Sequence, residues 1–286
     1  MKLFVLSIMN GLTLGALYFL VASGFTLVFG LMRNVNLAHG SLYLMGAYVG
    51  YDVAQVTGSW FLGVAGGFVS MALVGLLLQL VVFRHMQGQD LRQTLVTIGI
   101  SIVLADLMLA VWGGKTYQFD PPEWLYGGTP LPFVRIYPTY RLVLLGTAIV
   151  IGIGLWLFLN KTRIGMMIRA GVDDRGMLAA TGINVQVIFA VVFAIGAGLA
   201  GFAGVVGGTA LSIAPGEDTR YLLASLVVVI VGGMGSVTGA AIGAALIGLA
   251  EQLGLAYSPT YGVVYTFLIM VVVLAFRPQG LMGRPS

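Results

Sequence analysis

The sequence predicts an all-α polytopic membrane protein, and its composition, its charge and the length of its apolar runs all indicate this class. Of 286 residues, 59% are hydrophobic and only 8% are Asp, Glu, Lys or Arg. Soluble domains carry roughly 25% charged residues, so these few charged side chains cannot cover the surface of a soluble protein of this length. Residues 1–286 are therefore expected to form a single transmembrane domain.

Apolar runs along the chain predict the individual membrane segments. A hydrocarbon core about 30 Å thick needs about 20 apolar residues in a helix. Two runs, Leu42–Tyr51 and Leu222–Val231, are too short to span and predict half-helices or tilted spans broken at glycine. With the longer runs, the total is eight or nine segments. The longer runs are Leu3–Leu31, Trp60–Phe83, Thr94–Trp112, Leu142–Leu159, Val185–Val206, Val237–Leu255 and the shorter Val263–Phe276.

The basic residues assign a side of the membrane to each end of these segments. Most of them fall at alternate segment ends, which marks those ends as cytoplasmic under the positive-inside rule. The C-terminus is then cytoplasmic, and with nine crossings the N-terminus is external. The basic residues of the cytoplasmic set are Arg33, Arg84, Arg92, Lys161, Arg163, Arg169, Arg175, Arg277 and Arg284; the external set includes Arg135.

Two connections are long. Residues 113–140 form the external connection, whose prolines exclude regular helix, so we expect an ordered loop. Residues 160–184 form the longest cytoplasmic connection. The segment from Gly30 to Val35 is similar to the segment from Gly232 to Val237, which is a weak indication of a two-repeat architecture.

Several functions are excluded or left unsupported by the residues. The chain has no cysteine, and its two histidines lie far apart, so we expect no disulfide, no metal site and no cofactor. The net charge of +4 lies mainly on one side and indicates topology, not a nucleic acid partner. Gly114-Lys115-Thr116 has the ending of a phosphate-binding loop, but that loop also needs a glycine five residues before Gly114, where this chain has Leu109. We therefore do not expect this chain to bind ATP or to be an enzyme.

Two polar or glycine-rich breaks are candidates for a translocation path. Asn36, His39, Gly40 and Ser41 lie in a short polar stretch between two apolar segments, where donors and acceptors of a broken helix can line a passage. Gly232, Gly233 and Gly235 should interrupt a helix, which is tolerated at membrane depth only where protein or a water-filled cavity satisfies the backbone. The alternative for residues 36–41 is a purely structural turn. The alternative for residues 232–235 is glycine that serves only helix packing.

The connection over residues 160–184 predicts a short amphipathic helix. Met167, Ile168, Val172 and Met177 provide its apolar contacts, and the connection carries four basic and two acidic side chains. Such a helix on the inner face suits either the membrane surface or a protein partner, and the pattern alone does not choose between them.

At this connection the sequence resembles the branched-chain amino acid permeases of ATP-binding cassette importers, the Liv type. The resemblance covers essentially the whole chain in matching order. Its residues are Thr162-Arg163-Ile164-Gly165, Arg169-Ala170, Asp174, Ala179 and Gly182-Ile183-Asn184; Asn36 to Gly40 with Met45 to Tyr48; Gly198 to Gly201; Gly232 to Ser236; Ala250-Glu251; and Arg277 to Gly283.

The resemblance implies a transporter complex of several chains. Two permease subunits, usually a non-identical pair, would form the path, two cytoplasmic ATPases would drive it, and a periplasmic binding protein would deliver the substrate. Residues 163–184 would dock into an ATPase groove with the apolar face buried in the partner. The residues implied in this coupling are Arg163, Gly165, Met167, Ile168, Arg169, Ala170, Asp174 and Gly182.

Alternatives concern the substrate and the source of energy. Ala224 stands where many family members carry lysine, and the acidic segment 215–220 is unusual, so urea, amides or other amino acids remain open. A proton-coupled carrier would use Asp106, which lies within a span at a cost of about 2.5–3.5 kcal/mol and should face protein or water. Asp52 and Glu251 are expected to be interfacial anchors. A scaffold subunit would not explain the polar break at residues 36–41.

Overall fold

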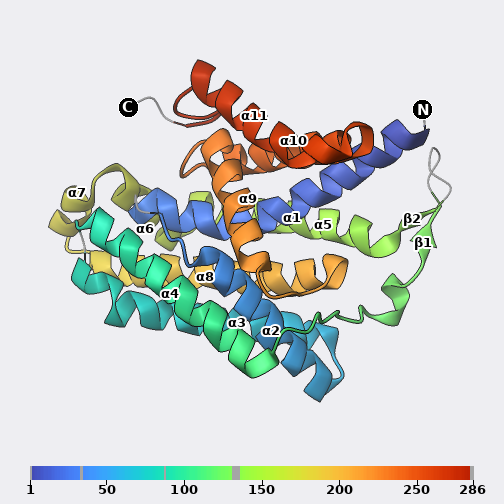
Figure 1. Cartoon of the computed structure of the whole chain (residues 1–286). Helices are drawn as coiled ribbons and strands as arrows, with labels where there is room; N and C mark the ends of the chain where they lie inside the picture. Colours follow the sequence, from blue (N-terminus) through green and yellow to red (C-terminus); the bar gives the residue numbers. More distant parts are fainter. Residues whose placement is uncertain (1, 33–34, 87, 131–135, 284–286) are drawn as a thin grey trace.

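The computed structural model describes residues 2–32, 35–86, 88–130 and 136–283, and it is almost entirely helical (Figure 1). Within these described ranges, six helices are long and apolar enough to cross a membrane, which confirms the predicted class. The α-helices are α1 (Lys2–Met32), α2 (His39–Thr57), α3 (Trp60–Val81), α4 (Asp90–Trp112), α5 (Thr139–Lys161), α6 (Arg163–Asp173), α7 (Arg175–Ala180), α8 (Val185–Leu211), α9 (Glu217–Gly232), α10 (Val237–Tyr257) and α11 (Gly262–Phe276).

The two runs predicted to be short segments are the helices α2 and α9. α2 begins beside the middle of α1, since the His39 side chain lies 3.0 Å from the backbone oxygen of Val21. α9 spans 16 residues, which is less than a full crossing requires. α9 therefore falls short of a full crossing, as the length of its apolar run predicts, whereas α2 extends beyond its apolar run to 19 residues, close to the length of a full crossing.

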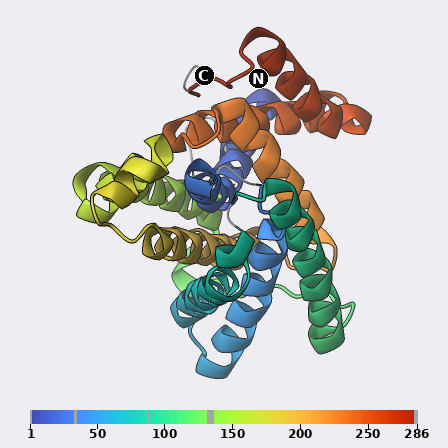
Figure 2. The same cartoon turned by 90° about the vertical axis from the view of Figure 1, so that its left-hand side faces the viewer.

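α1 and α8 form the centre of the bundle, and the other long helices surround them (Figures 1 and 2). Most of the apolar window of each central helix is buried inside the chain, whereas 22% or less of that window is buried in α3, α4 and α5. An outward apolar face of this kind suits lipid or a membrane-embedded partner.

Glycine permits the closest helix contacts. α1 packs along α10, and α8 packs along α3; these are the two most extensive pairings. At the crossing of α2, α3 and α8, a Cβ on Gly201 would overlap the backbone oxygen of Gly67, and a Cβ on Gly46 would overlap Gly201. Helices in lipid gain stability by such close backbone approach because lipid tails provide no hydrophobic drive between helices.

The helix order supports a two-repeat architecture. The series α1 to α4 and the series α8 to α11 each begin with a long helix followed by a shorter one, and the first helix of each series packs on the third of the other. The sequence similarity noted above does not mark equivalent places, because Gly30 lies near the end of α1 whereas Gly232 ends α9. That similarity was therefore the wrong basis for a repeat.

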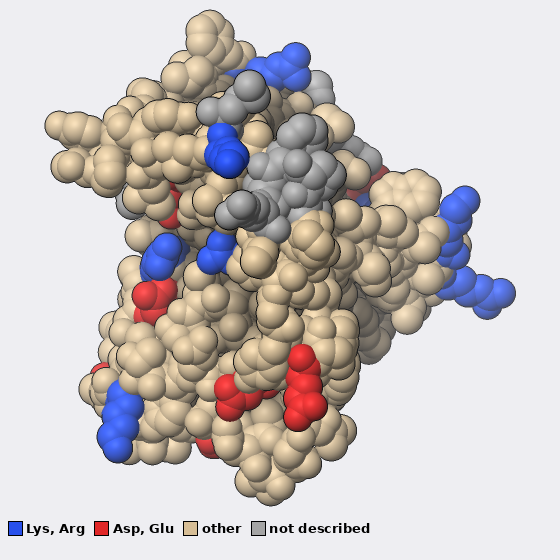
Figure 3. All heavy atoms as spheres, turned by 90° about the vertical axis from the view of Figure 1, so that its right-hand side faces the viewer, with Lys and Arg blue, Asp and Glu red and all other residues tan. Residues whose placement is uncertain are grey.

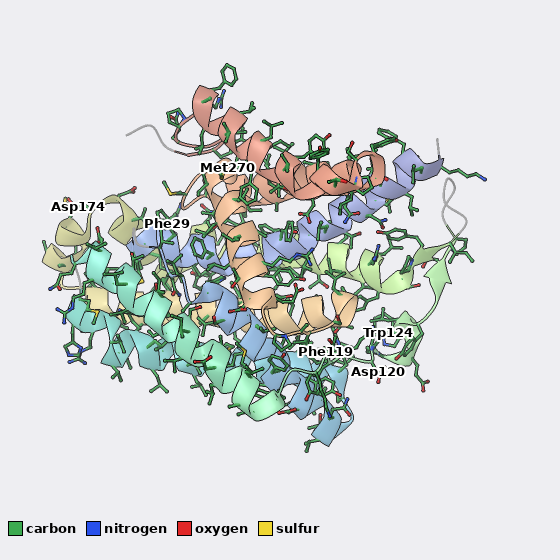
Figure 4. All side chains as sticks on the ribbon, in the orientation of Figure 1. Phe29, Phe119, Asp120, Trp124, Asp174 and Met270 are labelled. Atoms are coloured by element: carbon green, nitrogen blue, oxygen red, sulfur yellow. The ribbon has the colours of Figure 1, made fainter. Side chains whose placement is uncertain are left out.

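The two long connections lie at opposite ends of the bundle. Figure 4 shows Asp174, between α6 and α7, at one end, and Asp120 and Trp124, in the other connection, far from it. The end of α11 lies at the same end as α6 and α7 (Figure 1). The surface at the opposite end carries both basic and acidic side chains (Figure 3). Of the basic residues used for topology, Arg33, Arg135 and Arg284 lie outside the described residues.

The connection between α4 and α5 is held to the helices by specific contacts. It contains the 3-10 turn η2 (Glu123–Leu125) and the strands β1 (Gly128–Thr129) and β2 (Tyr137–Pro138), which pair antiparallel. Tyr137 is fully buried, and its hydroxyl lies 2.8 Å from the Thr13 hydroxyl and donates to Asn10. The described part of this connection is thus an ordered loop, as predicted.

Candidate functional site

The polar break before α2 is enclosed by the rest of the chain. The Asn36 side chain accepts a hydrogen bond from the amide of Ala38, 3.1 Å away, which stabilises the turn into the helix. The His39 ring contacts the Val21 carbonyl oxygen and packs edge-on against Phe25 at 5.3 Å. Asn36, His39 and Ser41 are all buried.

The first turns of α2 and α9 meet at this break. A Cβ on Gly40 would overlap the backbone oxygen of Asp218, so only glycine permits this approach. The Ser41 hydroxyl lies 2.8 Å from the Ser101 hydroxyl and donates to the Asp218 carboxylate at 3.2 Å. A helix N-terminus carries partial positive charge, so two such ends stabilise the buried carboxylate between them.

The glycine cluster after α9 is a true helix break. Gly233 and Gly235 have φ angles of 107° and 81°, which residues with a side chain rarely adopt. The backbone amides of Leu281 and Met282 donate to the oxygens of Val231 and Gly232, each at 2.9 Å. The segment after α11 therefore satisfies the carbonyl groups that end α9.

This capping by residues 277–283 was not predicted from the sequence. In the sequence the segment stands out only through the family resemblance, because hydrogen bonds between distant segments leave no local pattern. Gly280 has a φ angle of 80° and packs directly on Gly233, so both sides of the contact need glycine.

Removing one capping amide should weaken this end of the bundle. Leu281→Pro deletes the donor to Val231 and leaves a buried carbonyl unpaired, so we expect stability to fall by about 1–3 kcal/mol. Leu281→Ala keeps the amide and is the matched control. The thermal unfolding midpoint of both variants in detergent is the measurement, and equal midpoints would contradict the capping role.

A cavity of about 640 Å³ joins the second break to the amphipathic connection. Its wall includes Gly235 and Ser236 from the break, Arg169 and Asp173 from α6, and Met282 from the capping segment. The structure thus brings Gly235 together with Ile168 and Arg169, two of the residues for which the family resemblance implies a coupling role. The first break is not part of this wall.

A second, apolar groove of about 530 Å³ continues along α1, α5 and α10. It shares Trp156, Val237 and Thr238 with the first cavity, so the two hollows are contiguous.

The amphipathic connection forms two helices with defined caps. The Thr162 hydroxyl accepts from the Gly165 amide at 3.0 Å, and the Asp174 carboxylate accepts from the Met177 amide at 3.0 Å. Gly165 packs on the backbone of Phe158 and Leu159. Gly182, with a φ angle of 83°, follows α7 and lies in open space.

The apolar face of α6 packs against this same chain, whereas the family resemblance implies that a partner buries it. Ile168 is only 2% exposed and packs with Leu27, Leu31 and Ile188 of this same chain, and Met167 and Val172 pack against that cluster. Ile168 is therefore not available to a partner, and the packed sides of the half-buried Met167 and Val172 face this same chain. The exposed surface includes Arg163, Arg169, Ala170 and Asp174, together with Met166 and Met177.

A charged cluster at α9 and α10 was missed. Glu251 is only 6% exposed and accepts a hydrogen bond from the Tyr18 hydroxyl at 2.7 Å, so the expected role as an interfacial anchor is wrong. Arg220 lies 3.8 Å from Glu251 and 3.5 Å from Glu217. The acidic segment 215–220 was the available signal. Asp52 accepts from the Trp112 indole at 3.0 Å and lies exposed near the end of α2.

The fold and these sites define a class: a polytopic helical membrane protein with a short helix, α9, that ends in a glycine-rich break, and an amphipathic connection at one end. The family described as the permease component of the branched-chain amino acid transport system matches residues 7–274. The chain belongs to this family of transport permeases.

Individual relatives agree with this assignment. The high-affinity branched-chain amino acid transport system permease protein LivH of Salmonella typhimurium is 30% identical over 99% of this chain and 96% of its own length. BraD of Pseudomonas aeruginosa is 30% identical over 98% of this chain and 95% of its own length. LivM of Escherichia coli is 26% identical over 96% of this chain and 70% of its own length. No solved structure matches the chain.

Proposed function

We propose that this protein is the transmembrane subunit of an ATP-binding cassette importer that translocates branched-chain or related amino acids across the bacterial inner membrane. Separate ATPase subunits supply the energy. The observation that carries the proposal is the capped, amphipathic α6–α7 element, exposed at one end of a chain whose family is a transport permease component. The names of LivH and BraD support the substrate class.

The partners follow from the same family. A second, non-identical permease subunit completes the path, and similarity to both LivH and LivM supports such a pair. Two cytoplasmic ATPases bind the α6–α7 end, and a periplasmic binding protein delivers substrate to the opposite end. The C-terminus is then cytoplasmic and the N-terminus external.

Coupling runs through the cavity beside α6. Because α6 shares this cavity with Gly235 and the end of α1, a displacement of α6 by an ATPase is transmitted to the break after α9. Gly232, Gly233 and Gly235 provide the close backbone contacts at which the segments separate or approach. Asn36, His39, Gly40 and Ser41 line the path when the first turns of α2 and α9 move apart.

The docking role predicts that a charge on the exposed face of α7 disrupts assembly. Met177 is 71% exposed, so Met177→Asp leaves the fold intact but places a carboxylate in an apolar contact with the ATPase. We expect co-purification of the ATPases to fall at least tenfold. Val56→Asp, at an 87% exposed position near the end of α2, is the matched control.

Unchanged ATPase recovery with Met177→Asp would contradict the docking role. Substitution of Met167 or Ile168 is unsuitable for this experiment, because their packing on α1 and α8 makes unfolding the expected result.

Uptake by the reconstituted importer tests the substrate and the energy source together. Vesicles holding both permeases and the ATPases, with the binding protein outside, should accumulate labelled leucine only when ATP is inside. ATP-dependent uptake of labelled urea or of a labelled amide, without uptake of leucine, would overturn the substrate assignment. Leucine uptake driven by a proton gradient without ATPases would instead support a secondary carrier that uses Asp106.

A further inference from the structure

Asp106 lies on the outward face of α4 and is exposed. α4 stands at the periphery of the bundle in both ribbon views (Figures 1 and 2). Its buried residues, Gln93, Thr97, Leu104 and Met108, lie on the opposite face of the helix. The carboxylate forms no ion pair with the described part of the chain.

The position of Asp106 is unfavourable for a lipid neighbour. It precedes Trp112 by six residues, which places it about 9 Å along the axis from the helix end. The expectation that Asp106 faces protein or water is not met by a group of this chain. A group outside this chain must therefore contact the carboxylate on the outer side of α4. An ionised carboxylate within an apolar span faces a bundle interior, a cavity or a partner group.

The residues around Asp106 distinguish a protein partner from a water-filled passage. A passage would be lined by polar groups on several sides, whereas the surface around this carboxylate is apolar. Open space beside Gly99 permits close approach of a helix backbone. We define the α4 outer face as Gly99, Ile102, Val103, Asp106, Leu109 and Ala110, which share one side of the helix.

We propose that the α4 outer face binds a transmembrane helix of the second permease subunit, with a cationic or hydrogen-bond-donating side chain of that helix opposite Asp106. This inference rests on the proposed function, which supplies the second permease. A two-fold contact with another copy of this chain centred on Asp106 would oppose two carboxylates, which repel each other. The charge therefore favours a non-identical partner.

Photo-crosslinking in the assembled importer tests the surface. Benzoylphenylalanine replaces Val103 on α4, 65% exposed, or one of two matched controls: Leu77 on α3, 61% exposed, and Val150 on α5, 68% exposed. We expect the Val103 variant to crosslink the second permease at least tenfold more than either control. Lipid adducts alone at position 103, equal yields from the controls, or a crosslink to a second copy of this chain would overturn the proposal.

Asp106 itself is tested by two substitutions. Asp106→Leu should lower the yield of the permease pair at least fivefold while the chain expressed alone remains monodisperse, because leucine suits lipid but cannot pair. Asp106→Asn keeps a hydrogen-bonding group and should recover much of the pair. An unchanged pair yield with Asp106→Leu would overturn the role of the carboxylate.

The wild-type complex separates this inference from the proposed function. If the ATPases do not co-purify with the wild-type permease, the proposed function fails. If they do and Val103 does not crosslink the second permease, only the assignment of the α4 outer face fails.

Discussion

Gly201→Val is expected to prevent the central helices from packing. A side chain there would enter the backbone of Gly67 and the side chain of Met71 on α3, and Gly46 of α2 approaches from another side. Backbone atoms cannot move away without displacing whole helices, so the cost should exceed the about 1–3 kcal/mol typical of overpacking. The yield of monodisperse protein and its thermal unfolding midpoint are the measurements.

Gly146→Val provides the matched control for that experiment. Gly146 lies within α5, and a Cβ there would meet open space. The same substitution at this position should leave the yield and the midpoint nearly unchanged. Equal losses from the two variants would show that valine in a helix, and not the three-helix crossing, causes the effect.

Glu251→Leu is expected to destabilise the contact between α1, α9 and α10. The substitution leaves the buried Tyr18 hydroxyl without its acceptor and removes a carboxylate beside Arg220. Arg220 is about half exposed and regains water, so most of the loss comes from Tyr18. We expect a decrease of about 1–3 kcal/mol, measured as the thermal unfolding midpoint in detergent.

Glu251→Gln separates the hydrogen bond from the charge. Glutamine offers an oxygen to Tyr18 but no negative charge to Arg220, so it should recover more than half of the loss. If Glu251→Gln is as unstable as Glu251→Leu, the ion pair with Arg220 contributes most of the stability. That result would contradict the small contribution expected from the 3.8 Å separation and from the half-exposed Arg220 side chain.

The cavity beside α6 connects the helix break after α9 with two other parts of the chain. The break, the capping segment and the amphipathic connection all contribute to one wall. Under the proposed function, a motion of the exposed helices α6 and α7 would reach the glycine-rich contact through this shared wall. This connection joins residues that are distant in sequence, from Gly30 on α1 to Met282 after α11.

The sequence predicted the segments well because membrane thickness imposes a length on apolar runs. The two short apolar runs lie within α2 and α9, of which α9 is shorter than a full crossing, and the glycine cluster that begins with Gly232 at the end of α9 forms a true break. Prolines likewise indicated an ordered, non-helical connection between α4 and α5. Each of these features depends on residues that are neighbours along the chain.

The direction of a side chain was less predictable. Ile168 and Met167 were expected to face a partner, yet they pack on α1 and α8. Glu251 was expected at an interface with water, yet it is buried against Tyr18. An amphipathic pattern shows that a helix has an apolar face, but it does not show which surface covers that face.

The sequence by itself determined the membrane class, the short and broken segments, the amphipathic connection and the family. Only the tertiary structure decided that residues 277–283 cap α9, that the first turns of α2 and α9 meet around Asp218, and that Asp106 points outward. The physical reason is that composition and periodicity act over a few turns of one helix. Hydrogen bonds and close packing between distant segments depend instead on how the helices are placed against one another.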